Sequence, residues 1–180
     1  MKKFILFFTL ILFTFSIKIS AQTNYKSGEF LKFRIHYSGL NAGFATIDVK
    51  DVTLNGKSHY HIIGKGNSSG AVRAFFKVDD LYESYIDKAD LKPTKFVRNI
   101  VEGSYKRHQI VYFDHANKKA KIENKRDGKT TTEPIPFDAQ DLLSAFYSMR
   151  NADHSTLKTG DFLNENIFLM DETLKFKLKM

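Results

Sequence analysis

Hydrophobic and polar residues alternate along most of the chain after residue 22. Between residues 29 and 37, for example, Leu31, Phe33 and Ile35 alternate with charged residues or histidine. Because successive side chains of a β-strand point to opposite faces, this period of two predicts strands that are buried on one side. The pattern predicts further strands at residues 44–52, 58–65, 81–87, 94–102, 105–113, 119–124, 130–135, 162–170 and 173–179.

Short turn signals connect the predicted strands. Asn55-Gly56 and Asp127-Gly128 are typical of tight hairpin turns, in which backbone positions with positive φ favour asparagine, aspartate and glycine. Gly103 separates another pair of strands. Repeated hairpins predict a mainly β fold, an antiparallel meander curved into an open or partial barrel.

One segment has a helical period instead. Residues 138–149 are predicted to form one amphipathic helix packed on the sheet, with Asp138 as its N-cap and Asp141 near the positive end of the helix dipole. Leu142, Leu143 and Phe146 are expected to be its buried residues. The apolar positions that define the period are Leu142, Leu143, Ala145, Phe146 and Met149.

A glycine-rich segment, residues 64–70, follows the third predicted strand. Its lysine, Lys65, stands between two glycines, so the segment matches neither a phosphate-binding loop nor a dinucleotide-binding loop. We expect a flexible connection or a bulge there. Residues 69–76 are expected to form a short second helix or turn, with the Phe75-Phe76 pair anchoring a crossover.

The first 21 residues have the pattern of a secretory signal peptide. Lys2 and Lys3 precede a nearly continuous apolar run from Phe4 to Ile17, and Ala21 offers a cleavage site before Gln22. The alternative is an uncleaved N-terminal anchor, although the run is short for a bilayer span. We therefore expect an exported protein, periplasmic or associated with the outer envelope, with no transmembrane span in the mature chain.

The expected mature region, residues 22–180, is long enough for a single β-rich domain. Alternation continues up to Met180 with no closing turn, which predicts a domain truncated at its C-terminal end. The chain has 28 basic and 20 acidic residues; removal of Lys2, Lys3 and Lys18 lowers the net charge from +8 to +5. This small net positive charge and the expected export of the protein argue against nucleic-acid binding.

The composition narrows the chemistry further. The chain contains no cysteine. This excludes disulfides, thiolate zinc sites, a cysteine nucleophile and a lipoprotein anchored through cysteine. His59 and His61 share one face of a predicted strand, but no third ligand has diagnostic spacing, so solvated histidines are preferred to a metal site. No cofactor motif is present.

One cluster of charges is a candidate functional site. Asp80 and Glu83 lie close together in one predicted strand, and Arg98 and Glu102 share a face of the next. Paired carboxylates can perform acid–base chemistry when they converge in a cleft. The alternative is a set of ion pairs on the sheet surface.

Large aromatic residues suggest a second candidate, an apolar groove. Phenylalanines spread over several predicted elements could line a groove between the sheet and the helix, or could simply form the core. The candidate groove residues are Phe33, Phe75, Phe76, Phe96 and Phe146.

Five sequence segments, taken together and in their order along the chain, resemble the pattern of a known family. They lie at residues 28–37, 41–43, 75–87, 93–105 and 140–150, and they include Glu83-Ser84-Tyr85 and Asp141-Leu142-Leu143. The chain resembles the secreted domain-of-unknown-function family DUF3108 of Gram-negative envelopes, from about Tyr25 onward. The resemblance implies a signal peptide and further sequence after residue 180. By analogy it implies a fold similar to the open β-barrels of periplasmic lipoprotein carriers, and no catalytic residues.

Three functions remain open on the sequence alone. The first is a non-enzymatic envelope module that binds a lipophilic small molecule in an apolar groove. The second is an envelope hydrolase that uses Asp80, Glu83, Arg98 and Glu102. The third is a scaffold whose charges face an envelope protein partner.

Overall fold

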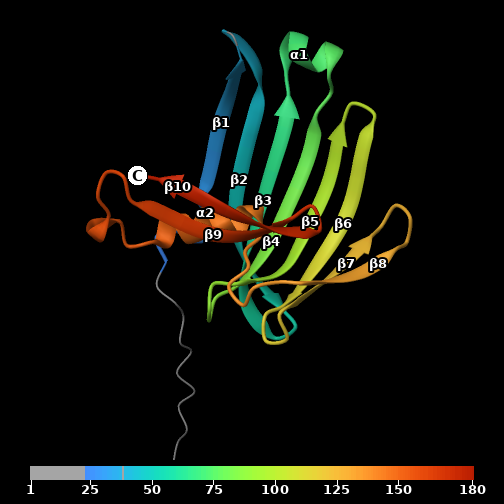
Figure 1. Cartoon of the computed structure of the whole chain (residues 1–180). Coiled ribbons are helices and arrows are strands. Elements are labelled where there is room, and N and C mark those ends of the chain that lie inside the picture. Colours follow the sequence, from blue (N-terminus) through green and yellow to red (C-terminus); the bar gives the residue numbers. More distant parts are fainter. Residues whose placement is uncertain (1–22, 38) are drawn as a thin grey trace, which may run out of the picture.

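The computed structural model describes residues 23–37 and 39–180 and is dominated by one antiparallel sheet (Figure 1). Its strands pair in chain order from β1 to β8, so each strand lies beside the next along the sequence. The predicted meander is confirmed. The strands are β1 (Phe30–Tyr37), β2 (Leu40–Leu54), β3 (Lys57–Ser68), β4 (Asp79–Asp87), β5 (Pro93–Glu102), β6 (Tyr105–Asp114), β7 (Lys119–Asn124) and β8 (Thr130–Pro134).

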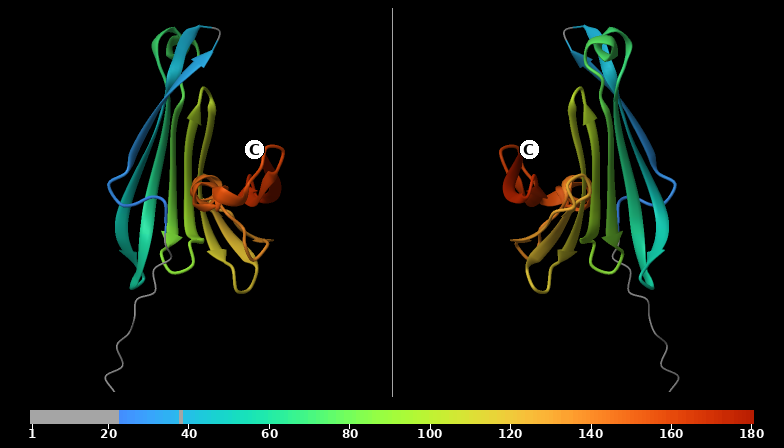
Figure 2. Two further views of the ribbon diagram at one scale, coloured as in Figure 1. Left: turned by 90° about the vertical axis from the view of Figure 1, so that its left-hand side faces the viewer. Right: turned by 90° about the vertical axis from the view of Figure 1, so that its right-hand side faces the viewer.

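The sheet is open. β1 and β8 are its two edges, and in the described part of the chain they do not pair with each other. Figure 2 shows that β7 and β8 bend toward the side that carries the helix α2 (Leu142–Asn151) and the C-terminal hairpin. The predicted open or partial barrel is therefore an open one.

A second, two-stranded sheet forms the outermost layer. It consists of β9 (Phe162–Leu169) and β10 (Glu172–Lys179), which pair in antiparallel register. In Figures 1 and 2 this hairpin crosses the large sheet, and α2 lies between the two. The order of layers is therefore large sheet, helix, hairpin.

The tight turns follow the backbone preferences of their residues. Asn55 and Gly56 have φ values of 50° and 77°, which confirms the predicted hairpin turn between β2 and β3. Met170 and Asp171, between β9 and β10, also have positive φ values of 55° and 68°. Because neither is glycine, this second turn gave no sequence signal.

The helix α2 begins three residues later than the expected cap would place it. Asp141, not Asp138, is the N-cap: its Oδ1 accepts hydrogen bonds from the backbone N–H groups of Leu143 and Ser144, both at 2.8 Å. The Ser144 hydroxyl lies 2.8 Å from the Asp141 backbone nitrogen and completes a capping box. Asp138 instead accepts hydrogen bonds from the amide of Asn166 on β9.

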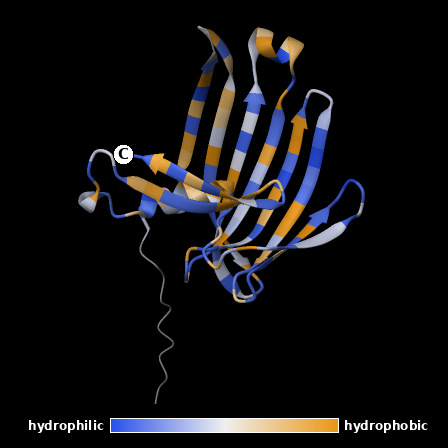
Figure 3. Cartoon of the chain, in the orientation of Figure 1, coloured by the Kyte–Doolittle hydropathy of each residue, from blue (hydrophilic) through white to orange (hydrophobic). Residues whose placement is uncertain are grey.

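The core forms under α2 and under the hairpin. One cluster joins Leu143 and Tyr147 of α2 to Val49, Ile62 and Ile86 of the sheet. The other includes Phe96, Val111 and Phe113 on β5 and β6, with Phe168 of β9 above them. The stripes in Figure 3 show the alternation along the strands that produces these buried positions.

The glycine-rich segment is strand and not the expected flexible connection. β3 continues through Ser68 and pairs with both β2 and β4. A Cβ atom at Gly64 would lie 3.0 Å from Cδ2 of Leu143, so glycine allows α2 to approach the sheet closely here. A Cβ at Gly43 on β2 would lie 2.3 Å from the Asn67 carbonyl oxygen, so glycine at this position allows β2 and β3 to approach each other closely.

The expected short helix after β3 is confirmed as α1 (Gly70–Phe75), but Phe75 anchors nothing there. Its surface is 92% exposed, whereas Phe76 lies against the turn at Gly103. No helix in the described ranges is long and apolar enough to cross a membrane. The predicted signal peptide, residues 1–21, lies outside the described residues.

Candidate functional site

The C-terminal hairpin is held over the sheet at its turn and along β9. At the turn, Asp171 accepts hydrogen bonds from Arg107 and Gln109 of β6, at 2.7 and 2.5 Å. Along β9, the backbone of Gln140 exchanges hydrogen bonds of 2.7 Å with Asn166 and Phe168. The hairpin therefore connects the start of α2 to β6. These contacts fix the position of the hairpin above the space between it and α2.

A cavity of about 540 Å³ lies between α2 and this hairpin. Apart from Lys175, its lining side chains are apolar. Leu142, Leu174 and Phe176 retain 38%, 39% and 42% of their surface. We call it the hairpin cavity; its lining residues are Leu142, Ala145, Phe146, Met149, Ile167, Leu169, Leu174, Lys175 and Phe176.

A second pocket, of about 420 Å³, adjoins the hairpin cavity and shares Leu142 and Leu169 with it. It lies over β4, β5 and β6 below the turn of the hairpin, and unlike the first it has polar groups on its floor. We call it the Arg98 pocket; its lining residues are Tyr82, Arg98, Ile100, Glu102, Tyr105, Leu142, Leu169 and Met170.

Arg98 stands out among the polar groups of this pocket. It is only 8% exposed, and its Nε and Nη1 atoms have no hydrogen-bond partner among residues 23–37 and 39–180. Burial lowers the pKa of Arg98, and the neighbouring Arg107 lowers it further. Since a guanidinium nonetheless remains charged at neutral pH, this is a buried cation without a bonded counter-ion in the described chain.

Two carboxyl groups lie near Arg98 without pairing with it. Burial and the nearby Asp80 carboxylate raise the pKa of Glu102, against the opposing effect of Arg98. Asp80 accepts a hydrogen bond of 3.0 Å from the backbone N–H of Val101. The pocket therefore combines one unpaired cation with nearby carboxyl groups that do not pair with it in the described chain.

Asp141 ties the start of α2 to the sheet beneath it. Its carboxylate is fully buried, and its Oδ2 accepts a hydrogen bond of 2.5 Å from the Ser84 hydroxyl of β4. Burial raises the pKa of Asp141 to about 6, although hydrogen bonds from Ser84, Ser144 and Leu143 oppose the rise. This contact fixes the helix that forms one wall of the hairpin cavity.

The other end of α2 is held by the segment before β1. Arg150 donates hydrogen bonds of 2.6 and 3.0 Å to the Glu29 carboxylate, which also accepts one of 2.8 Å from the Tyr147 hydroxyl. The hydrogen bonds from Arg150 hold the pKa of Glu29 below its usual value. Both ends of the helix are thus fixed by buried or half-buried carboxylates.

Glu83 is separated from the rest of the predicted charge cluster. Asp80 and Tyr82 share one face of β4, whereas Glu83 lies on the opposite face, where His61 approaches its carboxylate at 2.7 Å. The structure therefore separates Glu83 from Asp80, Arg98 and Glu102.

The pair of histidines also differs from the expectation. His59 is only 2% exposed and His61 bonds to Glu83, so they are not simply solvated. Within the described ranges no three His, Asp or Glu residues lie close enough to hold a metal ion.

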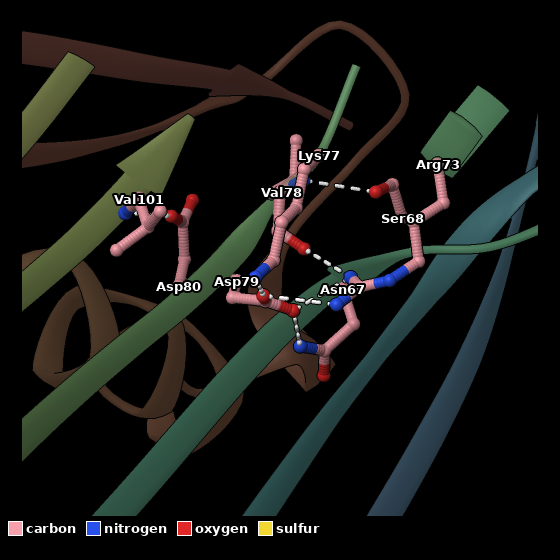
Figure 4. A network of polar contacts seen from close by, with 8 residues as sticks. All are labelled: Asn67, Ser68, Arg73, Lys77, Val78, Asp79, Asp80 and Val101. Carbon is pink, nitrogen blue, oxygen red and sulfur yellow. Dashed lines mark hydrogen bonds and ion pairs between the residues drawn. The ribbon is translucent and has the colours of Figure 1, made fainter. Parts of the chain in front are cut away.

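A further polar network at the α1 end of the sheet involves Asp79 but not Arg98 (Figure 4). Arg73 donates two hydrogen bonds to the Asp79 carboxylate, and Asn67 donates one. Together with Lys77 they hold the pKa of Asp79 well below its usual range. These are local contacts that connect α1 to β4.

Comparison with known proteins identifies the family. The model of a family described as a protein of unknown function, DUF3108, matches residues 32–180. The chain belongs to the DUF3108 family. No curated protein and no solved structure matches it. Membership of DUF3108, as the sequence resemblance predicted, is therefore confirmed, and within DUF3108 the question of function rests on the geometry of this site.

The five phenylalanines proposed for a groove lie in different places. Phe96 is core and 1% exposed, and of the five only Phe146 lines the hairpin cavity. Phe33 is 44% exposed on the edge strand β1, and Phe75 and Phe76 lie around α1. They do not form one groove.

Sequence reasoning missed several residues that do form the site. Leu169, Leu174 and Phe176 belong to the hairpin, and Tyr82 and Tyr105 come from β4 and β6. Leu174 and Phe176 were recognised as one face of a strand, but the position of that strand above α2 gave no signal in the sequence. The alternation of apolar and polar residues along β10, on both sides of Phe176, was the only sequence feature that pointed to this apolar face.

Proposed function

We propose that this chain is an exported, non-enzymatic binding protein that holds a lipophilic small molecule in the hairpin cavity. The observation that supports this most directly is the cavity itself. Eight of its nine lining residues are apolar, yet they surround a space of about 540 Å³ instead of filling it. Pockets for small molecules have this size and character.

The energetics favour a ligand with an alkyl chain. Leu142, Leu174 and Phe176 keep apolar surface in contact with solvent, and covering it contributes about 25 cal/mol per Å². Each methylene of a ligand buried there contributes about 0.8 kcal/mol, which is roughly a fourfold gain in affinity. The signal-peptide pattern of residues 1–21 supports export to a compartment where such molecules occur.

The hydrolase alternative has less support. Only three of its four proposed residues share a face of the sheet, and the Asp80 carboxylate is already bonded to the Val101 backbone. The scaffold alternative would require the charges to face outward, whereas Arg98 and Asp80 are buried.

The proposal is tested by competition between alkanols and an environment-sensitive fluorescent probe, N-phenylnaphthylamine. Octanol, decanol and dodecanol should displace the probe with affinity rising about fifteenfold for each two added methylenes. Leu174→Asp should abolish this binding, because it places a carboxylate in the cavity wall.

Leu178→Asp is the matched control. Leu178 lies on the same strand and has nearly the same exposure, 40% against 39%, but it does not line the cavity. It should leave alkanol binding unchanged. Absence of chain-length dependence, or equal losses in the two variants, would contradict the proposal.

A further inference from the structure

The Arg98 pocket contains a cation that the described chain does not neutralise. Arg98 is more than nine-tenths buried, with two of its three nitrogens unbonded, and it lines the pocket floor. Leaving a buried charge unpaired is costly, so such a group is normally found with a counter-ion.

The nearby carboxylates do not supply that counter-ion. Asp171 is bound by Arg107 and Gln109, which occupy both of its oxygens. Asp80 bonds to the Val101 backbone, and the Nε and Nη1 atoms of Arg98 bond to no carboxylate in the described part of the chain. Arg98 therefore lines the pocket without a bonded counter-ion from the described chain.

The pocket also adjoins an apolar space. Leu142 and Leu169 border both the Arg98 pocket and the hairpin cavity. One molecule could therefore place a polar end beside Arg98 and an apolar chain between α2 and the hairpin.

We propose that Arg98 binds the anionic head group of an amphiphile whose alkyl chain lies in the hairpin cavity. This rests on the proposed function, because it assigns the chemical class of the ligand to the same site. The polar end of the ligand is inferred from the Arg98 pocket, and its apolar end from the hairpin cavity.

The chemistry favours a single carboxylate as the head group. A guanidinium is planar, and its N–H groups match the two oxygens of a carboxylate. Tyr82 and Tyr105 add hydroxyl groups to the lining. Asp80 and Glu102 nearby disfavour a doubly charged group such as a phosphate monoester, because their carboxyl groups would repel the second charge. The ligand class is therefore a fatty-acid-like monoanion.

The test compares decanoate with decanol at neutral pH and below the micellar concentration, by probe displacement on the wild-type chain. Decanoate should bind at least about tenfold more tightly, as expected for a charge-assisted hydrogen bond. Arg98→Gln should reduce this preference to about twofold or less while decanol affinity stays the same. Arg98→Lys, which keeps the charge but loses the planar guanidinium, should retain part of the preference.

Lys177→Gln is the matched control, because Lys177 is an exposed cationic residue of the same hairpin that lines neither the hairpin cavity nor the Arg98 pocket. It should leave the preference intact; loss of the preference in this variant, or its retention in Arg98→Gln, overturns the assignment to Arg98. A second readout is the stability of the ligand-free protein. Arg98→Gln should unfold at the same or a higher denaturant concentration than wild type, since it removes an unpaired buried charge. A markedly lower midpoint would show a structural role instead.

The wild-type result also separates the two proposals. If decanol and decanoate bind equally, the anion site is wrong and the lipophilic cavity stands. If neither binds, the proposed function fails, and the anion site fails with it.

Discussion

At the scale of single residues, two of the buried charged residues, Asp141 and Arg98, differ in how their surroundings satisfy them. Asp141 accepts hydrogen bonds from Ser84, Leu143 and Ser144, so its carboxylate is structural. Arg98 has no such set of partners in the described chain and faces a pocket. Burial together with missing partners, more than charge itself, marks the residue available for binding.

Asp141 should give the protein a pH-dependent stability. Its pKa is raised from 3.8 to about 6 in the fold, so the folded state binds this proton more tightly than the unfolded chain does. The free energy of unfolding should therefore rise as the pH falls from about 6 to about 4. Relative to Asp141→Asn, which cannot titrate, the wild type should gain up to about 3 kcal/mol over that interval.

Chemical denaturation of both proteins between about pH 7 and about pH 4 measures this difference. Asp138→Asn is the control, because Asp138 is exposed and does not cap the helix. A difference between wild type and Asp141→Asn that is constant with pH would show that the carboxylate is not desolvated.

At the scale of elements, the site depends on how closely α2 approaches β3. Leu143 lies over Gly64, where a Cβ atom would be only 3.0 Å from its Cδ2, while a Cβ at Gly66 would meet nothing nearer than 3.9 Å. Two glycines of one strand, two residues apart and on the same face, therefore have different roles. The missing side chain of Gly64 allows α2 to approach β3, whereas that of Gly66 plays no part in this contact.

Gly64→Val should lower the free energy of unfolding by about 1–3 kcal/mol, because the added methyl groups force α2 away from the sheet. Gly66→Val should be neutral or slightly stabilising, since valine favours the strand conformation and has room there. Urea denaturation of the two variants is the measurement. Equal losses would mean that glycine is needed for β3 itself and not for the helix contact.

At the scale of the whole molecule, the layers are joined by contacts between distant parts of the chain. Glu29, before β1, bonds to Arg150 and Tyr147 at the far end of α2. Tyr25 packs between Tyr60 and Tyr147, with ring centroids 4.9 and 4.3 Å away. The N-terminal part of the described chain thus fixes α2 from one side, and the hairpin fixes it from the other.

Glu29→Gln should lower the free energy of unfolding by about 1 kcal/mol at neutral pH, because it removes a charged, partly solvated contact with Arg150. The pKa of Glu29 is lowered in the fold, so its contribution is complete above the ordinary value of 4.5 and is lost as the pH falls toward the folded value.

The gap between wild type and Glu29→Gln should therefore narrow in acid, the opposite of the Asp141 effect. Denaturation curves at neutral and acidic pH test this, with Glu172→Gln on the exposed start of β10 as the control. A gap that widens in acid would be inconsistent with the ion pair.

The sequence by itself determined the family, the meander and the existence of α2. These follow from local properties: the period of two along β1 to β8, the Asn55-Gly56 turn, and the apolar spacing in α2. Even the register of each hairpin is local, since a turn between consecutive strands leaves few alternatives. The helix N-cap was misplaced because Asp138 and Asp141 both suit that position, and only the contact with Ser84 on β4 distinguishes them.

Only the tertiary structure decided which apolar residues are core and which line a cavity. Alternation assigns Phe33, Phe96 and Phe176 to strand faces in the same way, yet one lies on an open edge, one in the core and one in the hairpin cavity. The difference depends on where α2 and the hairpin lie, which is set by contacts between residues far apart in the chain. The same holds for Arg98, whose burial without a partner comes from the layers above β5, because a strand's sequence specifies its two faces but not what covers them.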